Sequence, residues 1–583
     1  MPTLEWIGKD KVVNQHLDVP YRVLERKYSY DESGQHEEDN GSENMIIHGD
    51  NLDALKALLP RFEGRIKCIY IDPPYNTGNE KWVYNDNVND PRIRAWLGKV
   101  VGTEGEDLSR HDKWLCMMYP RLKLLQRLLS DDGAIFISID DNEYANLKLI
   151  CDEIFGLNCF VSNISWQRTY STRNDSKGIV NEAEHILCYS KQPDWQPNKL
   201  PRTEEMDSKY KNPDNDVAMW RSDNPYAADA QTHQGMVYAI QHPFTGELLY
   251  PSAGSHWRYG QNDMLNAMSG WCEYKLQELD DAEKRAQICG VEKSDIRAGV
   301  KAIILAQPLE ESSKKAREVY EQGPWPKFFF SKNGMGGIAR KTYRKDVGGV
   351  PPTNFFPFSK TGHTDEAKKE LHTIFGGSSP FDTPKPTRLL EFILKIAADP
   401  NALILDSFAG SGTTAHAVLN MNKADGGIRR FILVEMEDYA DSITAERVKR
   451  VISGYGEGKK SVEGTGGDFS FFELGQPLMI GDVLNEDVGV EKIREYVYFT
   501  ETKARLPEPY ADEPYFMGVH VNSAYYFYYE QDAVTTLNRE FLHTVKTKAD
   551  AYVIYADLCM LSEAELEAYH ITFKKIPRDI TKL

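Results

Sequence analysis

The chain has 583 residues, of which 41% are hydrophobic, so it is not a wholly disordered protein and we predict three or four domains. The net charge of −19 argues against a protein that coats DNA through its bulk charge, although it is compatible with a local basic cleft. The sequence has neither an apolar run of the roughly 20 residues that cross a bilayer nor an N-terminal signal peptide, so we expect a soluble, cytoplasmic protein without membrane contact. The eight cysteines form no CxxC pair, and we expect no metal site.

Strands and helices alternate in the first third of the chain, after a polar stretch over 31–43 that we expect to be a loop. Short apolar runs predict buried strands, and apolar residues at helical spacing predict amphipathic helices. Pro120 should kink the longest of these helices and Gly133 should end it. In chain order we predict a strand over 44–49, a helix over 51–62 capped by Asp50, a strand over 66–72, a helix over 113–130 and a strand over 134–140.

The same alternation returns late in the chain, which is typical of a parallel sheet with helices on both faces. Residues 191–379, rich in Trp, Tyr, Asn, Gly and Pro, break the pattern and are predicted to be an insertion. The Gly-rich stretch 453–468 predicts a domain boundary, and aromatic strands over 524–530 and 551–556 predict a small α/β domain after it. The late elements are a helix over 387–398, a strand over 402–407, a helix over 413–421, a strand over 430–435 and a helix over 441–452.

The first chemical motif, Asp72-Pro73-Pro74-Tyr75, stands at the end of a predicted strand. Ligands of open α/β sheets bind at the carboxyl ends of strands, where this motif lies. The Asp72 carboxylate and the Pro73 carbonyl can accept hydrogen bonds from an amino group, and Tyr75 offers a flat face on which an extruded base can stack. Four residues by themselves leave open an ordinary proline-rich turn.

The second motif is Asp406-Ser407-Phe408-Ala409-Gly410-Ser411-Gly412-Thr413-Thr414, between a strand and a helix. Gly410 and Gly412 let the backbone turn tightly and approach a ligand closely. Glu435 ends the next strand, where an acidic side chain suits a ribose diol. Binding of NAD or FAD is the generic alternative, although position 415 is Ala where the dinucleotide fingerprint has its third Gly.

With both motifs in this order and an insertion between them, the sequence resembles the β-class DNA amino methyltransferases, above all the modification subunits of type III restriction–modification systems. The likeness covers roughly residues 44–190 and 325–455. It implies a Rossmann-like methyltransferase sheet and a site-specific enzyme that transfers a methyl group from S-adenosylmethionine to adenine N6 in DNA. The blocks that carry the likeness are 48–59, 70–79, 113–143, 362–376, 381–393 and 405–435.

The resemblance also implies a division of the chain into functional parts. These are an N-terminal arm over 1–43, a catalytic half over 44–190, a target-recognition insertion over 191–379, a cofactor half over 380–455 and a C-terminal accessory domain over 456–583. The catalytic loop would be Asp72, Pro73, Pro74 and Tyr75. The cofactor-binding residues would be Asp50, Lys385, Asp406, Phe408, Gly410, Ser411, Gly412, Thr413, Thr414 and Glu435. From the residues alone, Asp50 is equally well a helix cap, and Lys385 a solvated loop charge.

Basic stretches mark the candidate contacts with DNA, because phosphate binding needs clustered Lys and Arg. The stretch 331–345 has no acidic residue, and the stretch 165–177 mixes basic with aromatic side chains. A third stretch, 312–317, is more typical of a solvated helix face. The residues predicted to bind DNA are Arg168, Arg173, Lys332, Arg340, Lys341, Arg344 and Lys345.

Family resemblance implies double-stranded DNA as the substrate, a homodimer, and a helicase–nuclease restriction subunit as a partner. Cytosine N4 offers the same amino chemistry as adenine N6, so a cytosine-N4 or orphan regulatory methyltransferase is the alternative. A non-catalytic DNA-recognition subunit and an NAD-dependent oxidoreductase are further alternatives. The recognition sequence is not encoded in either motif.

Overall fold

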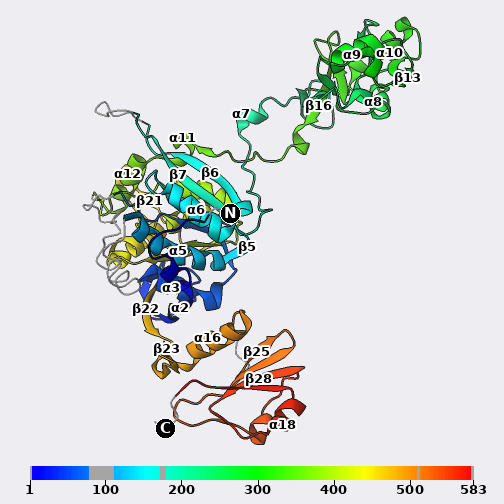
Figure 1. Ribbon diagram of the computed structural model, residues 1–583. Helices are drawn as coiled ribbons and strands as arrows, with labels where there is room; N and C mark the ends of the chain where they lie inside the picture. The colour runs from blue at the N-terminus through cyan, green and yellow to red at the C-terminus, as the bar shows by residue number, and fades with distance from the viewer. Residues whose placement is uncertain (1–2, 78–109, 171–178, 378, 508–511, 579–583) are drawn as a thin grey trace. The chain divides into compact units, whose positions relative to one another are not determined.

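The structure is a computed structural model that describes residues 3–77, 110–170, 179–377, 379–507 and 512–578. The chain forms two compact units (Figure 1). One comprises Met1–Asn198 with Pro352–Leu583, and the other comprises Lys199–Pro351. The second unit is therefore narrower than the insertion predicted over 191–379.

A mixed sheet forms the centre of the first unit. Its middle strands, from β5 to β22, run parallel to their neighbours, as predicted for the core of the fold. β7 runs antiparallel to β5, and β1 runs antiparallel to β22, so the sheet is not wholly parallel. In sheet order the strands are β17 (Phe355–Phe356), β6 (Phe160–Gln167), β7 (Ala183–Ser190), β5 (Leu129–Ile139), β4 (Ile66–Ile71), β18 (Leu403–Asp406), β19 (Arg430–Glu435), β3 (Met45–His48), β22 (Phe469–Pro477), β1 (Arg22–Asp31) and β2 (Gly34–His36).

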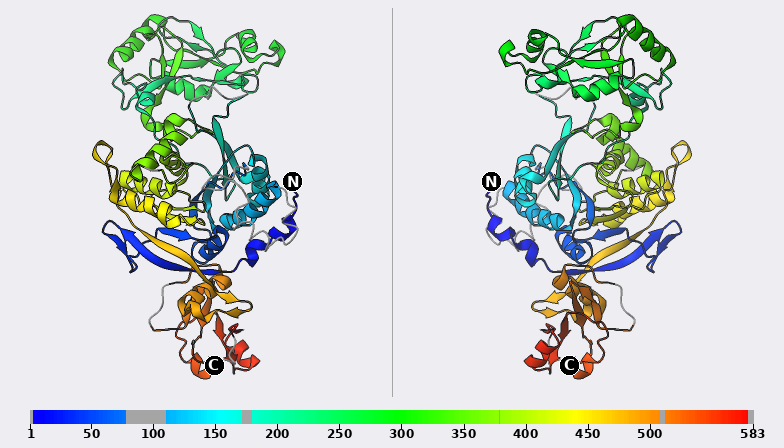
Figure 2. Two further views of the ribbon diagram at one scale, coloured as in Figure 1. Left: turned by 90° about the vertical axis from the view of Figure 1, so that its left-hand side faces the viewer. Right: turned by 90° about the vertical axis from the view of Figure 1, so that its right-hand side faces the viewer.

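Helices cover both faces of this sheet (Figure 2). The apolar residues of the helices on one face pack with the strands into one large buried core. One face carries α3 (Asn51–Phe62), α5 (Arg110–Leu128) and α6 (Tyr144–Phe155), and the other carries α12 (Thr364–Ile374), α13 (Thr387–Ala397), α14 (Thr413–Asp425) and α15 (Glu446–Ser453). This is the layered arrangement that the alternating sequence pattern predicts.

Gly133 does not end the long helix, contrary to the prediction. The helix α5 ends at Leu128, and β5 begins at Leu129 and runs through Gly133. A side chain at this position would place its Cβ 2.9 Å from the carbonyl oxygen of Ile66 in β4. Glycine is therefore needed here because the two strands approach closely, not because the chain turns.

Segments from both ends of the chain extend the central sheet. β22 lies in the region assigned to the accessory domain, yet it pairs in parallel with β3. β1 pairs with β22, and its hairpin partner β2 lies inside the stretch 31–43 that was predicted to be a loop. These strands cover the open edge beyond β3, which would otherwise expose unpaired backbone groups.

The unit Lys199–Pro351 has its own aromatic core, which includes Trp220, Trp257 and Trp271. Leu200 and Val350, at its two ends, exchange both backbone hydrogen bonds at 2.8 Å. Its main elements are β8 (Trp220–Asp223), β10 (Ile240–Gln241), β11 (Leu248–Leu249), β13 (Tyr274–Gln277), β14 (Ala302–Leu305), β15 (Phe328–Phe330), β16 (Ile338–Tyr343), α8 (Gln261–Met268), α9 (Ala282–Cys289) and α10 (Leu309–Gln322).

The C-terminal region folds as a small α/β layer, as predicted. The expected strands over 524–530 and 551–556 form β26 (Ser523–Phe527) and β28 (Ala551–Ala556), which are parallel. α16 (Val490–Thr502) packs on this region, and the Tyr21 ring lies tilted against the Tyr496 ring with 4.9 Å between ring centroids. The remaining strands of its sheet are β25 (Phe516–His520) and β30 (Ile571–Lys575).

Candidate active site

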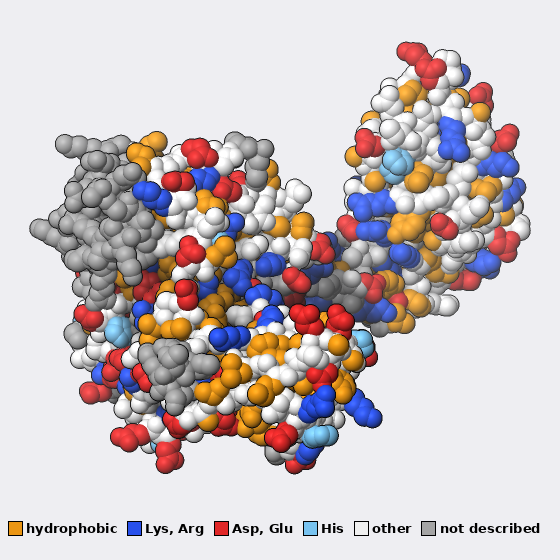
Figure 3. All heavy atoms as spheres, turned by 60° about the horizontal axis from the view of Figure 1, so that its bottom comes forward, with side chains coloured by type: hydrophobic (Ala, Val, Ile, Leu, Met, Phe, Trp, Pro, Cys, Tyr) orange, Lys and Arg blue, Asp and Glu red, His pale blue; other side chains and the backbone are white. Residues whose placement is uncertain are grey.

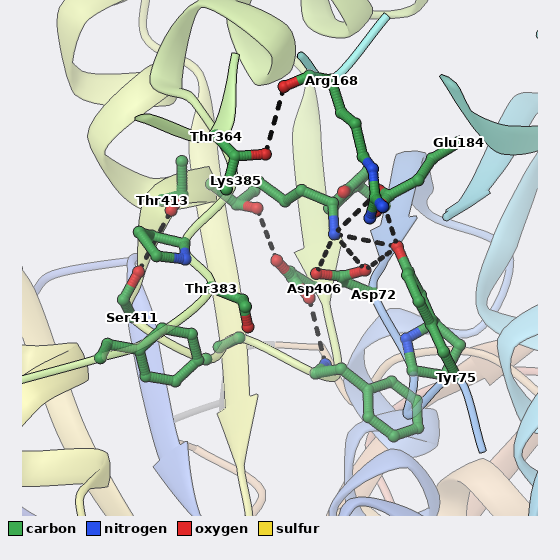
Figure 4. Close-up of a pocket in the computed structure, with 18 of the residues that line it drawn as sticks. Asp72, Tyr75, Arg168, Glu184, Thr364, Thr383, Lys385, Asp406, Ser411 and Thr413 are labelled. Carbon is green, nitrogen blue, oxygen red and sulfur yellow. Dashed lines mark hydrogen bonds and ion pairs between the residues drawn. The ribbon is translucent and has the colours of Figure 1, made fainter. Parts of the chain in front are cut away.

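A cavity of about 590 Å³ opens at the carboxyl ends of β4 and β18 and brings the two sequence motifs together (Figure 4). Its size lies in the range of small-molecule sites, and this edge of an α/β sheet is where such sites form. The first motif contributes Asp72, Pro73 and Tyr75, and the second contributes Asp406, Phe408, Ala409, Gly410, Ser411, Thr413 and Thr414. The cavity is further lined by Tyr70, Thr77, Asp140, Trp166, Arg168, Glu184, Thr364, Phe381, Thr383, Pro384 and Lys385.

Asp72 follows β4 directly, and its carboxylate is the centre of a polar network (Figure 4). Lys385 Nζ donates to both Asp72 oxygens at 2.7 Å and to Tyr75 Oη at 2.9 Å. Tyr75 Oη in turn donates to Asp72 Oδ1 at 2.9 Å. Trp114 Nε1 donates to the Pro74 carbonyl at 2.7 Å and holds the loop against α5. Lys385 therefore donates hydrogen bonds to two residues of the first motif, and its predicted contact with a cofactor stays a prediction.

Glu184 is a second carboxylate in this network, and the sequence reasoning missed it. It lies in β7, and its oxygens are 2.6 Å from Arg168 Nη1, 3.2 Å from Tyr75 Oη and 3.7 Å from Lys385 Nζ. Two acidic and two basic groups thus balance one another in a mostly buried space. No motif surrounds Glu184 in the sequence, and only the pairing of β7 with β5 brings it to the cavity.

Burial changes the pKa values of two residues in the first motif, Asp72 and Tyr75. Burial raises the pKa of Asp72 above its usual range, and the ammonium of Lys385 opposes that rise. Burial raises the pKa of Tyr75 well above its ordinary value, and the neighbouring Asp72 carboxylate raises it further. Tyr75 therefore remains a hydrogen-bond donor throughout the physiological pH range.

The glycine loop between β18 and α14 has the conformation that the sequence predicts. Gly410 and Gly412 have φ values of 51° and 79°, in the left-handed region that favours glycine. The Gly410 amide donates to Glu435 Oε2 at 2.7 Å, and its carbonyl accepts from Thr444 Oγ1 at 2.6 Å. Asp406 Oδ2 accepts from Thr414 Oγ1 at 2.5 Å. Hydrogen bonds to Glu435 and Thr444 therefore hold the loop in place, and the bond from Thr414 to Asp406 closes it from within.

Two buried carboxyl groups support this loop. Burial raises the pKa of Asp406 to about 7, and Asp406 lines the cavity. Burial raises the pKa of Glu435 to about 8, and its two oxygens accept backbone N–H bonds from Gly410 and Glu437. Glu435 thus anchors the loop, and its contact with a ribose stays a prediction.

A buried arginine beneath the loop was also missed. Arg447 donates to Ser411 Oγ at 3.0 Å and to Thr413 Oγ1 at 2.8 Å, and its side chain is 1% exposed. It comes from α15, the helix that follows the loop's own βαβ unit. Its run of sequence resembles any charged helix face, so no local signal identifies it.

Asp50 is a helix cap in this structure. Its Oδ1 accepts from the Leu52 amide at 2.8 Å, and Arg121 Nη2 lies 3.3 Å from its other oxygen. Within the described residues, Asp50 is not among those that line the cavity. The cap function is therefore observed, and the cofactor contact stays a prediction.

The residues predicted to bind DNA separate into different groups. Arg168 lies in the cavity wall, and Arg173 lies outside the described residues. Arg340 pairs with Asp223 at 2.6 Å, and Arg344 with Asp207 at 2.8 Å. Lys332 and Lys345 are exposed.

Lys341 is not available to DNA, and its prediction is wrong. The side chain is fully buried and forms ion pairs with Asp214 and, at 2.5 Å, with Asp216. Successive residues of β16 point to opposite faces, so a basic run on a strand sends some of its side chains inward. Figure 3 shows other Lys and Arg side chains on the exposed face of the same unit.

Metal and membrane features are absent from the part of the chain that the structure describes. No group of three His, Cys, Asp or Glu side chains there is arranged to hold a metal ion. Among the same residues, no helix has the length and apolar character needed to cross a membrane.

Comparison with known proteins places the two motifs in one family. A family model described as DNA methylase matches residues 66–446. The chain is 32% identical over 474 residues to the Mod subunit of the type III restriction-modification enzyme StyLTI from Salmonella typhimurium, covering 77% of this chain and 62% of that one. It is 28% identical over 470 residues to the EcoP15I Mod subunit from Escherichia coli, covering 75% and 64%. The chain therefore spans less than two thirds of the length of these relatives.

One solved structure with similarity is the PvuII DNA methyltransferase, described as cytosine-N4-specific. It aligns with a TM-score of 0.31 at 13% sequence identity, over 70% of this chain and 86% of that one.

Proposed function

The chain belongs to the DNA methylase family, and we propose that it transfers a methyl group from S-adenosylmethionine to N6 of adenine in double-stranded DNA. The observation that carries this proposal is that Asp72 and the glycine loop line one cavity. Asp72 alone could belong to an ordinary proline-rich turn, and the glycine loop alone could bind a dinucleotide. Together in one cavity, they place an acceptor for an amino group beside a loop that can hold a methyl donor. We further propose that the chain acts in a type III-like restriction–modification system, because two relatives are Mod subunits of such enzymes.

The residues present fit S-adenosylmethionine, which joins a cationic sulfur and an amino acid group to an adenosine. The Asp406 carboxylate, the Ser411 and Thr413 hydroxyls and the Phe408 ring line the same cavity. A carboxylate suits the cationic groups, hydroxyls suit the amino acid end, and an aromatic ring suits the adenine. When bound, S-adenosylmethionine supplies a methyl group attached to positively charged sulfur.

Asp72, Pro73 and Tyr75 would position the base once it has left the duplex. Tyr75 stacks on the extruded base, and the Asp72 carboxylate and Pro73 carbonyl accept hydrogen bonds from its amino group. Holding the nitrogen in line with the methyl carbon supplies much of the rate. With the hydrogens of the amino group held by the Asp72 carboxylate and the Pro73 carbonyl, its nitrogen lone pair would be left to face the methyl group that the bound cofactor would supply.

Cytosine N4 has the same amino chemistry, so the choice of adenine rests on the family resemblance. We also propose that the chain works as a homodimer, with double-stranded DNA and a helicase–nuclease subunit as partners. Base recognition would lie mainly in the unit Lys199–Pro351, with Lys332 and Lys345 as exposed phosphate contacts.

Modification-aware single-molecule sequencing of DNA from cells that express the chain tests this function. We expect N6-methyladenine at one short motif with the wild type and none with Asp72→Ala. Calorimetric titration should show that Asp72→Ala still binds S-adenosylmethionine, because the glycine loop is intact. N4-methylcytosine in place of N6-methyladenine would correct the base only. Turnover retained by Asp72→Ala would contradict the assignment of the catalytic loop.

A further inference from the structure

Lys385 occupies the Asp72 carboxylate, which the proposed reaction needs as an acceptor for the amino group of the base. Its ammonium is 2.7 Å from both Asp72 oxygens, the same oxygens that must accept from the amino group of the base. With Tyr75 also donating to Oδ1, three of the roughly four lone-pair sites of the carboxylate are taken. The amino nitrogen also gains positive charge as it accepts the methyl group. An ammonium on the same carboxylate opposes that charge.

Glu184 offers the ammonium a second place. Its Oε2 lies 3.7 Å from Lys385 Nζ, so a small rotation of the flexible lysine side chain closes the gap. The carboxylate is 7% exposed and is fixed from the other side by Arg168 at 2.6 Å. The backbone of Arg168 is fixed at the same place, because its carbonyl accepts from the Thr364 amide at 3.0 Å. Glu184 is therefore a buried acceptor that no part of the proposed mechanism has used.

Aromatic rings line the space around the ammonium. Lys385 Nζ is 5.1 Å from the centre of the Tyr75 ring and 5.9 Å from the centre of the Trp166 ring. Ring faces attract a cation and stabilise it while it exchanges one carboxylate for the other. Without a second carboxylate, leaving Asp72 would strand a buried positive charge, which is strongly unfavourable.

We propose that Lys385 is a shuttling cation: it rests on Asp72 in the free enzyme and moves to Glu184 when the target base enters. This rests on the proposed methyl-transfer function and adds Glu184 to it as a positioning residue. Asp72 then meets the amino group as a carboxylate without its ammonium partner, and the network of Asp72, Glu184, Lys385 and Arg168 keeps the same formal charge. Glu184 acts through Lys385 and does not touch the reacting atoms.

Glu184→Gln tests the exchange because it keeps the shape of the side chain and an oxygen that can accept from Arg168. We expect the single-turnover methylation rate to fall by about 100-fold, the effect of leaving a buried ammonium without a charged partner. The dissociation constant for S-adenosylmethionine should stay within about twofold, because the glycine loop keeps its own hydrogen bonds in this variant. Glu182→Gln, a carboxylate two residues earlier that does not line the cavity, is the matched control and should keep the wild-type rate.

A double-mutant cycle with Lys385→Met separates the exchange from a structural role. With no ammonium to receive, the further change Glu184→Gln should lower the remaining rate by less than about threefold. The same 100-fold loss in both backgrounds would overturn the proposal, because Glu184 would then act independently of Lys385. A wild-type rate in Glu184→Gln alone would also overturn it. Absence of methyl transfer by the wild type would instead refute the proposed function, and the exchange with it.

Discussion

Asp406 is a buried carboxyl group that lines the candidate active site. It is 3% exposed, and burial raises the pKa of its carboxyl group to about 7. The acid form therefore predominates at pH 6 and the carboxylate at pH 8. A cationic cofactor binds the carboxylate form better, so cofactor binding and proton release are coupled at this one side chain.

Binding of S-adenosylmethionine should therefore weaken as the pH falls. Because the ionised fraction of a group with a pKa near 7 drops about tenfold from pH 8 to pH 6, the dissociation constant should rise about tenfold over the same range. Calorimetric titration at pH 6, 7 and 8 measures this directly. In Asp406→Asn the affinity should be lower and the pH dependence flat. A slope that persists in this variant would assign the titration to Glu435, whose pKa is raised to about 8.

At the scale of elements, the connection from β18 to α14 has the shape that we propose holds the cofactor. Gly412 precedes α14 with a φ of 79°, and a Cβ added there would lie 2.9 Å from the carbonyl oxygen of Thr444. Both the backbone conformation and the neighbouring chain therefore require glycine. Gly426 follows the same helix with a φ of 71°, but a Cβ there would meet nothing within 4 Å.

This pair of glycines makes a matched test of the loop. Gly426→Ala should cost about 1 kcal/mol of unfolding free energy, from the left-handed backbone alone, and leave cofactor binding unchanged. Gly412→Ala should cost more than that and weaken binding of S-adenosylmethionine by about tenfold or more, because the loop must move away from Thr444. Urea unfolding and calorimetry give the two quantities. Equal effects of the two variants on binding would contradict a shaped loop.

At the scale of the whole molecule, the chain enters and leaves the unit Lys199–Pro351 at paired positions. Leu200 and Val350 face each other as an antiparallel pair with both hydrogen bonds at 2.8 Å. A two-residue turn is the usual way to join such a pair. The unit also has a separate aromatic core, so the first unit does not depend on it for its own packing.

Replacing residues 201–349 by Asn-Gly should consequently leave the first unit folded. We expect this variant to bind S-adenosylmethionine within about twofold of the full chain, since the cofactor loop lies outside the excised region. It should lose preference for DNA that carries the recognition sequence over DNA with that sequence scrambled. Competition binding with the two DNAs measures the preference. A retained preference would place base recognition in the first unit.

Sequence alone determined both motifs of the site, because each motif is a local run of residues. Asp72 and Gly412 each follow a buried strand within a few residues, and strand ends at one edge of a parallel sheet converge. The alternation of elements likewise predicted the central strands and the helical layers. Such features depend on neighbours in the chain, which a pattern of residues records.

Only the tertiary structure decided which side chains share the cavity and which are buried. Glu184 meets Asp72 because β7 joins the sheet antiparallel to β5, a pairing that no local pattern encodes. Lys385 bridges Asp72 and Tyr75 across more than 300 residues of chain, a contact that no local pattern predicts, and its contact with a cofactor stays a prediction. Lys341 belongs to a basic run but points inward to Asp214 and Asp216. The sequence gives the number and spacing of the charged residues. The fold decides which way each side chain points and which partner it meets, because long-range contacts form only when strands and helices pack.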